Sequence, residues 1–159
     1  MLGPLRAGWR IECWTAIRSK SGLLAKKPIA AWGRAMPIQK EHKEFYTVDI
    51  YGDGWHSPTG YPPGIQQKIL AGKLDDTNRT GNRTRLLRFA PGAFTTTPFV
   101  HDYWEEVYLI SGSLIVGNWT RDDAETFGPN TYACRPPGIR HGPFKSAQGC
   151  LLLEFHYYE

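Results

Sequence analysis

Glycine and proline interrupt this sequence so often that they leave little room for long helices. Seventeen glycines and twelve prolines are spread over 159 residues, and 13% of the residues are aromatic. Short segments separated by turns and rich in aromatic residues are typical of antiparallel sheets. The 41% of hydrophobic residues can fill one core, and the length is that of one domain. The sequence therefore predicts a single all-β domain.

The predicted strands are clearest after residue 85, where helical periodicity is absent. Residues 105–118 read as two strands joined at Ser111-Gly112, residues 125–138 as a strand ended by two prolines, and residues 149–159 as a closing strand. Upstream, residues 45–50 alternate well enough for a first strand, whereas residues 51–65 hold too much glycine and proline for a regular element. We expect an N-terminal strand and a long loop or arm over residues 36–84, and the core of a β-barrel over residues 85–159.

Charge is divided unevenly along the chain. Of the 19 basic and 15 acidic residues, residues 1–35 hold seven basic residues and the single acid Glu12, which leaves twelve basic and fourteen acidic residues downstream. Because nucleic acids are bound by clusters of positive charge, the slightly acidic remainder argues against such a partner.

Residues 1–35 resemble a transit peptide in charge but have few serines, so we expect a non-structural extension. No apolar run approaches the roughly 18 residues of a membrane span.

The cysteines indicate a reducing compartment. Cys13, Cys134 and Cys150 are an odd number without C-x-x-C spacing. That pattern is typical of free thiols in the cytoplasm rather than of a secreted disulfide framework. We therefore expect a cytoplasmic protein, in which Cys134 packs as a small apolar residue.

His101, Glu105 and His141 form a candidate metal site. Residues four apart on a straight strand lie roughly 13 Å from each other, whereas ligands of one ion must each approach it to roughly 2.2 Å. His101 and Glu105 can share an ion only if the chain turns at residues 102–104. A third ligand, His141, follows a strand that ends at Pro136 to Gly138.

Two imidazoles and one carboxylate on rigid elements leave coordination positions open. This set suits non-haem Fe(II), and Zn, Mn or Ni can use it as well. We therefore expect one divalent metal ion as cofactor, with Fe(II) favoured. Glu105 and His141 are also the candidate catalytic residues, because a carboxylate or an imidazole can move a proton beside the metal.

The segments around these residues resemble the two motifs of the cupin family. Residues 89–114 match the first motif at Gly92, His101, Glu105 and Gly112, and residues 128–144 match the second at Pro136, Gly138 and His141. The sequence is similar to the small ChrR-like and acetylacetone-dioxygenase-like cupins. The resemblance implies a jelly-roll barrel with residues 85–159 as the cupin core, a metal inside the barrel, a small-molecule substrate and a homodimer.

One ligand position departs from the cupin motif. Similar cupins place a histidine two residues before His101, where this chain has Phe99, and we expect the Phe99 side chain to point into the barrel. On the closing strand, Glu154 and His156 share a face with Leu152. If that face lines the barrel, His156 is a possible additional ligand. Otherwise both are surface residues, which is the reading that we favour; a cupin that has lost its metal is a further alternative.

Several residues are candidates for a substrate pocket. They are the aromatic residues Phe94, Phe99, Tyr132 and Phe144, and Arg88, which could bind an anionic group.

The resemblance to diketone-cleaving cupins suggests a small metal-dependent dioxygenase that cleaves a carbon–carbon bond of an enolisable or diketone-like substrate. The alternatives are a non-redox isomerase, cyclase, lyase or hydrolase with a Lewis-acid metal, and a ChrR-like ligand-binding sensor without turnover.

Overall fold

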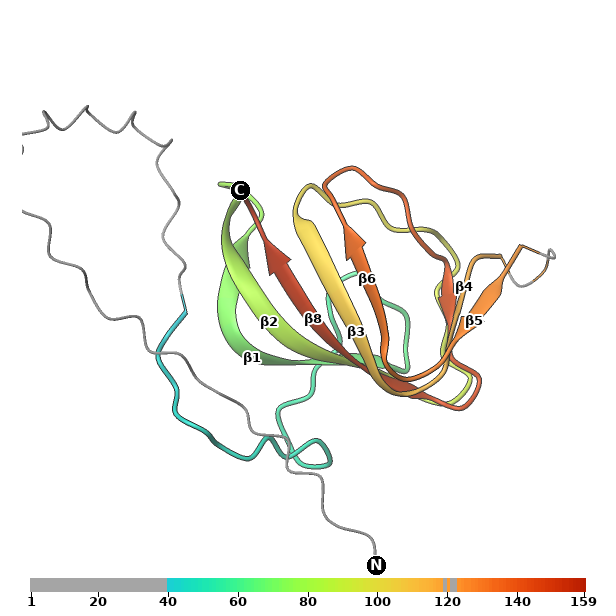
Figure 1. Ribbon diagram of the computed structural model, residues 1–159, viewed down its shortest axis with the longest axis horizontal. Coiled ribbons are helices and arrows are strands. Elements are labelled where there is room, and N and C mark those ends of the chain that lie inside the picture. Colours follow the sequence, from blue (N-terminus) through green and yellow to red (C-terminus); the bar gives the residue numbers. More distant parts are fainter. Residues whose placement is uncertain (1–39, 119, 121–122) are drawn as a thin grey trace, which may run out of the picture. The chain divides into compact units, whose positions relative to one another are not determined.

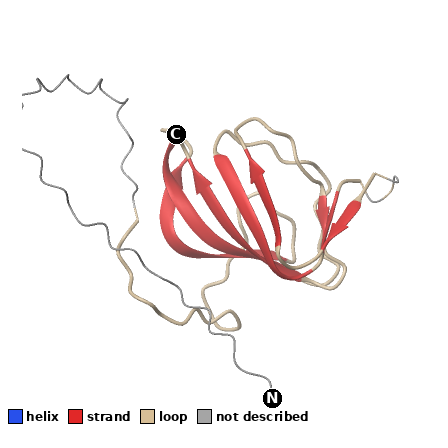
Figure 2. Ribbon diagram, viewed as in Figure 1, coloured by secondary structure: helices blue, strands red, loops and turns tan. Residues whose placement is uncertain are grey.

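The computed structural model describes residues 40–118, 120 and 123–159, and the extension expected over residues 1–35 lies outside that part. The described residues form strands and no helix, so none could span a membrane as a helix (Figure 1, Figure 2). In chain order the strands are β1 (Ile65–Asp75), β2 (Thr80–Phe89), β3 (Trp104–Gly112), β4 (Leu114–Val116), β5 (Glu125–Phe127), β6 (Thr131–Arg135), β7 (Phe144–Lys145) and β8 (Cys150–Tyr157). The predicted all-β class is confirmed.

The strands form two antiparallel sheets that share one core. The larger sheet has the order β1-β2-β8-β3-β6, and the smaller sheet has the order β5-β4-β7. β8, at the end of the chain, therefore lies between β2 and β3, as Figure 1 shows. Leu87 and Leu152 of the larger sheet are buried in the same cluster as Leu114 and Phe144 of the smaller one. The two sheets thus face each other across this core.

The inward faces of β2, β8 and β3 all change from apolar to polar in the same direction, and on β3 the change comes one inward residue later, since Val107 lies opposite Glu154. From the apolar end, these residues are Phe89, Leu87, Arg85 and Arg83 on β2, Cys150, Leu152, Glu154 and His156 on β8, and Leu109, Val107 and Glu105 on β3. Since side chains alternate with a period of two, each strand contributes one continuous inward row. The interior therefore has an apolar half, which is the core, and a polar half.

A buried ion pair lies where the two halves meet. Arg85 and Glu154 are 2% and 3% exposed, and Arg85 Nε donates to Glu154 Oε2 at 2.6 Å. Arg85 also donates to Gln67 Oε1 at 2.7 Å and to the Tyr61 hydroxyl at 3.2 Å. Burial raises the pKa of the Glu154 carboxyl, but the charge of Arg85 outweighs it and holds that pKa below its ordinary value. Glu154 is therefore a buried carboxylate with its counterion in place.

The strand predicted over residues 45–50 is wrong. Phe45 and Tyr46 are exposed, and the Asp49 carboxylate accepts hydrogen bonds from the amides of Tyr51 and Gly52 at 2.9 Å each. Such an aspartate turn competes with strand pairing. The first strand is instead β1, which lies in the region that we expected to be the N-terminal strand and arm.

Two other surface assignments are also corrected. Glu154 and His156 face the interior rather than the surface, because they pair in register with Arg85 and Arg83. Cys134, expected to be buried, is exposed, because it alternates with Ala133 and Arg135 on β6 and points outward.

Arg85→Met should destabilise the protein by about 3–5 kcal/mol, because Glu154 would remain buried without its counterion. Urea unfolding followed by tryptophan fluorescence measures this loss. The double variant Arg85→Met/Glu154→Leu should recover most of it, since no unpaired charge remains. A double variant no more stable than the single variant would contradict this role for the ion pair.

Candidate metal centre

Three segments bring His101, Glu105 and His141 together. Glu105 is on β3 and faces inward, His101 precedes the bend before β3, and His141 lies between β6 and β7. Backbone hydrogen bonds join the two histidine-bearing loops, since the Gly138 amide donates to the His101 carbonyl at 2.8 Å. Phe99 and His141 also exchange a pair of backbone hydrogen bonds of 2.8 and 3.0 Å. The bend at residues 102–103 lets His101 and Glu105, four residues apart, reach one point.

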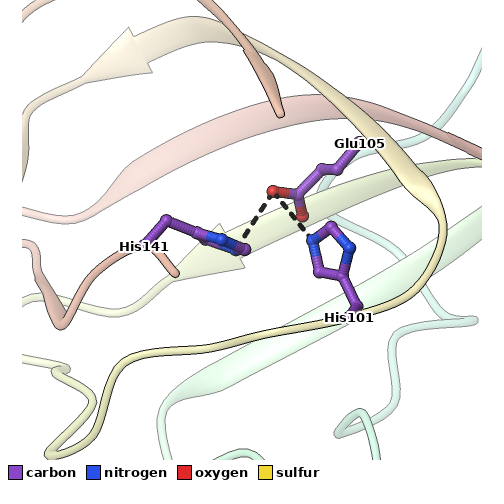
Figure 3. A group of neighbouring side chains, drawn as sticks. All are labelled: His101, Glu105 and His141. Atoms are coloured by element: carbon purple, nitrogen blue, oxygen red, sulfur yellow. Dashed lines mark ion pairs between the residues drawn. The ribbon is translucent and has the colours of Figure 1, made fainter. Parts of the chain in front are cut away.

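One oxygen of Glu105 is the meeting point of the three side chains (Figure 3). Glu105 Oε2 lies 3.6 Å from His101 Nε2 and 3.3 Å from His141 Nε2. The side chains of His101, Glu105 and His141 are 10%, 8% and 8% exposed. All three atoms lie within 4.8 Å of one another, close enough to share one ion.

The hydrogen bonds of the two histidines decide which ring nitrogen carries the proton. His101 Nδ1 lies 2.8 Å from the Tyr103 carbonyl oxygen, and His141 Nδ1 lies 2.9 Å from the Ile139 carbonyl oxygen. A carbonyl oxygen can only accept, so both Nδ1 atoms carry a proton. In the neutral rings, both Nε2 atoms then present lone pairs to the Glu105 oxygen. His101 Nε2 is buried and has no hydrogen-bond partner among the described residues.

The charge states also favour a cation. Burial lowers the pKa of His141, which favours its neutral ring. Burial raises the pKa of Glu105, but the facing His156 imidazole and the charge of Arg135 outweigh it and hold the pKa well below its ordinary range. Two lone pairs and a carboxylate converge on one point, and a metal ion would relieve their mutual repulsion. The donor set therefore fits a divalent metal.

Arg135 at the end of β6 bonds to the same carboxylate. Its Nη1 donates to Glu105 Oε2 at 2.6 Å, and the residues pair directly across β3 and β6. The guanidinium carbon lies 5.6 Å from the centre of the Phe144 ring. Arg135 thus partly neutralises the oxygen that a metal would take.

Several solved structures with the same architecture are remote in sequence. They include an RmlC-like cupin from Shewanella frigidimarina (TM-score 0.52, 16% identity, 77% of this chain and 96% of that chain). They also include an acetylacetone dioxygenase from Acinetobacter johnsonii (TM-score 0.52, 18% identity, 74% and 77%) and the polyketide cyclase RemF from Streptomyces resistomycificus (TM-score 0.51, 20% identity, 75% and 81%). The chain has the cupin fold. No protein-family model matches the sequence, and no curated protein matches it.

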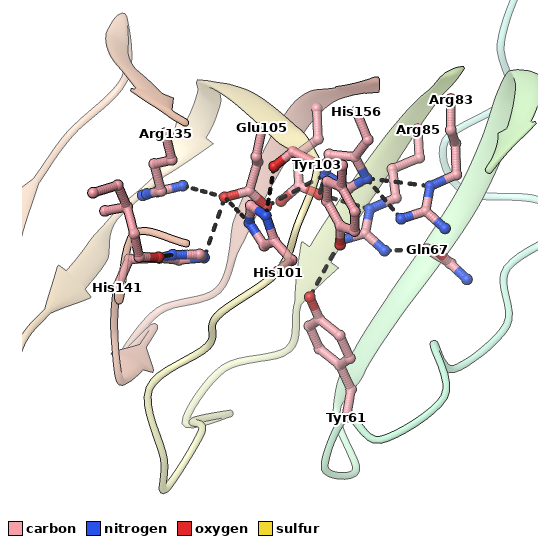
Figure 4. A network of polar contacts seen from close by, with 12 residues as sticks. Tyr61, Gln67, Arg83, Arg85, His101, Tyr103, Glu105, Arg135, His141 and His156 are labelled. Atoms are coloured by element: carbon pink, nitrogen blue, oxygen red, sulfur yellow. Dashed lines mark hydrogen bonds and ion pairs between the residues drawn. The ribbon is translucent and has the colours of Figure 1, made fainter. Parts of the chain in front are cut away.

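His156, on β8, lies next to Glu105 on the side away from His141 (Figure 4). Its Nε2 lies 3.3 Å from Glu105 Oε1 and 3.4 Å from Glu154 Oε2. These three residues also offer atoms close enough for one ion. However, Arg83 Nη2 donates to His156 Nδ1 at 2.6 Å, and arginine cannot accept a hydrogen bond. In the neutral ring the proton is therefore on Nε2, which makes His156 a donor facing Glu105 rather than a metal ligand.

Phe99 and Phe144 lie beside the candidate metal centre. Both line a cavity of about 30 Å³ together with Glu105 and His141. The Phe99 ring stacks on Tyr61 with centroids 5.0 Å apart and lies 6.2 Å from the His141 ring. Phe99 thus faces the ligands from the position at which similar cupins are expected to have a histidine.

The other pocket candidates lie elsewhere in the cupin fold. Arg88 donates to Gln66 and stacks over Trp55, so it does not line this cavity. Phe94 is 45% exposed and outside it, whereas Tyr132 is 57% exposed, donates to Glu106 and lines a second cavity instead. Arg83 and Arg85 were not assigned to the site from the sequence. Their alternation with Leu87 and Phe89 was the signal that they share the inward face.

His141→Ala should lower the affinity for Zn²⁺ by more than about 100-fold, the upper range for losing only an outer-shell partner. Competition titration with a chromophoric chelator measures this affinity. The control His42→Ala should bind as wild type, since the His42 side chain is 83% exposed and contacts Glu44. His156→Gln should keep one ion per chain. Full affinity in His141→Ala would contradict the centre, and loss of the ion in His156→Gln would make His156 a ligand.

Phe99→His should tighten metal binding, because a fourth ligand would be added on the cavity side of the ion. The same titration, together with the visible absorption of Co²⁺-loaded protein, detects the added nitrogen ligand. Phe99→Leu is the matched control, since it changes the ring without adding a ligand. Identical Co²⁺ spectra for Phe99→His and Phe99→Leu would show that residue 99 does not reach the ion.

Proposed function

We propose that this protein is a mononuclear metal-dependent dioxygenase acting on a small enolisable or diketone-like substrate. The observation that carries the proposal is the convergence of His101 Nε2, His141 Nε2 and Glu105 Oε2 on one buried point. Two histidines and one carboxylate with open positions are the set that non-haem Fe(II) oxygenases use. A bound Fe(II) ion would supply the redox chemistry that carbon–carbon cleavage by O₂ requires.

The residues around the centre support a small and largely apolar substrate. Phe99, Tyr61 and Phe144 form one wall of the cavity that contains Glu105 and His141. Aromatic walls exclude water and hold planar groups such as an enol. The ring hydrogen bonds of His101 and His141 to backbone carbonyls fix both imidazoles in the orientation that a metal needs.

A second candidate is a non-redox enzyme in which a Zn, Mn or Ni ion polarises a carbonyl group. The specific observation in its favour is Glu154, a second buried carboxylate that lines the same cavity as Glu105 and His141 and could accept a proton there. A proton-transfer group beside a Lewis acid suits isomerases and cyclases. The solved structures include both an acetylacetone dioxygenase and a polyketide cyclase, so the fold alone does not choose between the candidates.

Oxygen uptake separates the candidates. Protein loaded anaerobically with Fe(II) is mixed in an oxygen electrode with acetylacetone, longer 2,4-diketones, enolisable oxo acids and catechols. We expect uptake that depends on one of these substrates and falls to background in His101→Ala and His141→Ala, with His42→Ala as active as wild type.

Other outcomes overturn the dioxygenase. Substrate conversion by Zn-loaded protein without oxygen uptake would favour the Lewis-acid enzyme. A rise in melting temperature with a diketone, without any conversion, would favour a ligand-binding sensor.

A further inference from the structure

Arg135 lies between the metal centre and a second, larger cavity. This cavity has a volume of about 190 Å³ and shares Val107, Leu114, Arg135 and Leu152 with the cavity at the metal centre. The rest of its wall is mainly apolar and includes Leu109, Val116 and Phe127. Arg135 is the one charged side chain among the described residues that line it. An apolar group in this cavity would thus meet a guanidinium at the end nearest Glu105.

The Arg135 guanidinium is well placed to bind another anion. Among the described residues it makes one hydrogen bond, through Nη1 to Glu105 Oε2, although a guanidinium has five N–H donors. The Phe144 ring packs against it at 5.6 Å and restricts its orientation. A metal ion bound at Glu105 Oε2 would compete with Arg135 for that oxygen. Arg135 would then have its donors free to bind a ligand.

The net charge of the side chains around the proposed metal centre also favours binding of an anion. The polar network contains the guanidinium groups of Arg83, Arg85 and Arg135 and the carboxylate of Glu105, which Figure 4 labels. It also contains the carboxylate of Glu154, which pairs with Arg85. Three positive groups face two negative ones, so the excess is one positive charge, and a divalent ion would raise it to three. Uncompensated charge is costly in a buried site. A ligand that brings negative charge would therefore be favoured over a neutral one of the same shape.

We infer that the substrate is a small carboxylic acid with an apolar body, whose carboxylate binds Arg135 beside the metal and whose body fills the 190 Å³ cavity. The inference rests on the proposed metal centre and narrows its substrate to enolisable oxo acids rather than neutral diketones. The cavity is below the roughly 300–1,000 Å³ of pockets for drug-sized ligands, so the body is about the size of one ring or a short alkyl chain. Arg135 would act as the specificity-determining residue, by pairing with the carboxylate through two parallel hydrogen bonds.

Calorimetric titration of the full chain loaded with Zn²⁺ tests whether Arg135 binds a substrate carboxylate. Because Zn²⁺ is redox-inactive, the affinity can be measured without oxidative turnover. The probes are 3-phenylpropionate and the nearly isosteric neutral 3-phenylpropanamide. We expect the acid to bind at least about tenfold more tightly than the amide, because the carboxylate forms a charge-assisted hydrogen bond with Arg135 that the neutral amide lacks. Arg135→Gln should abolish this preference, whereas the matched control Arg88→Gln should keep it, because Arg88 contacts Gln66 and Trp55 away from both cavities.

Two failures are distinguishable in the same experiment. Wild-type protein that binds one Zn²⁺ but binds acid and amide equally would overturn the carboxylate site and leave the metal centre standing. Wild-type protein that binds no Zn²⁺ would overturn the proposed function and this inference with it. Comparing the affinities of the two probes for wild-type protein shows whether the site prefers a carboxylate, even if Arg135→Gln does not fold. If it folds and still prefers the acid, Arg135 is not the anion-binding residue.

Discussion

The ion pair of Arg85 with Glu154 lies at the boundary between the apolar and the polar half of the interior, and the polar half depends on it. Removing one partner would leave a buried charge without compensation, which costs more than the pair contributes when intact. With both partners present, β2 and β8 carry charged and polar residues inward next to Leu87 and Leu152. His156 and Glu105 occupy the adjoining positions on β8 and β3. The candidate metal centre thus lies beside a buried ion pair whose two charges balance each other.

Glu105 lies between His156 and the other residues of the candidate metal centre. One of its oxygens faces His156, and the other faces His101, His141 and Arg135. A carboxylate can accept from several directions at once, whereas each imidazole can offer only one lone pair. The partner of Nδ1 sets the tautomer of each ring. His101 and His141 donate from Nδ1 to backbone carbonyls, whereas His156 accepts at Nδ1 from Arg83. The groups that bond to Nδ1 of each ring therefore distinguish the two candidate metal ligands, whose Nε2 atoms carry lone pairs, from His156, whose Nε2 carries a proton.

Much of this could be predicted from the sequence, because glycine, proline and strand alternation limit the fold directly. The spacing of His101, Glu105 and His141 was informative because it required a turn that the chain can make, and the structure has a bend there. The inward face of β8 could not be predicted from hydrophobicity. Its other face carries Leu151, Leu153 and Phe155 and is the more apolar one. Pairing of Glu154 with Arg85 decides the orientation, and that pairing depends on a strand about 70 residues away in the sequence.

The same limitation explains the strand that was wrongly placed at residues 45–50. Alternation shows that a segment can be a strand, but a strand also needs a neighbour with free backbone groups. Here Arg88 and Trp55 donate to the Ile50 carbonyl from side chains, and Asp49 closes a turn. Sequence patterns describe one segment at a time and do not include such competition.

The backbone hydrogen bonds between the two histidine-bearing loops have a consequence for the thermodynamics of ion uptake. Gly138 and His101 are joined, and so are Phe99 and His141, so the loops are held together before any ion arrives. Ordering a free loop on binding consumes conformational entropy of roughly 1–2 kcal/mol for each residue fixed. Loops that are already paired lose little of this on capture of an ion. Metal uptake by this barrel should accordingly be governed by desolvation of the ion and displacement of Arg135, rather than by folding of the polypeptide around it.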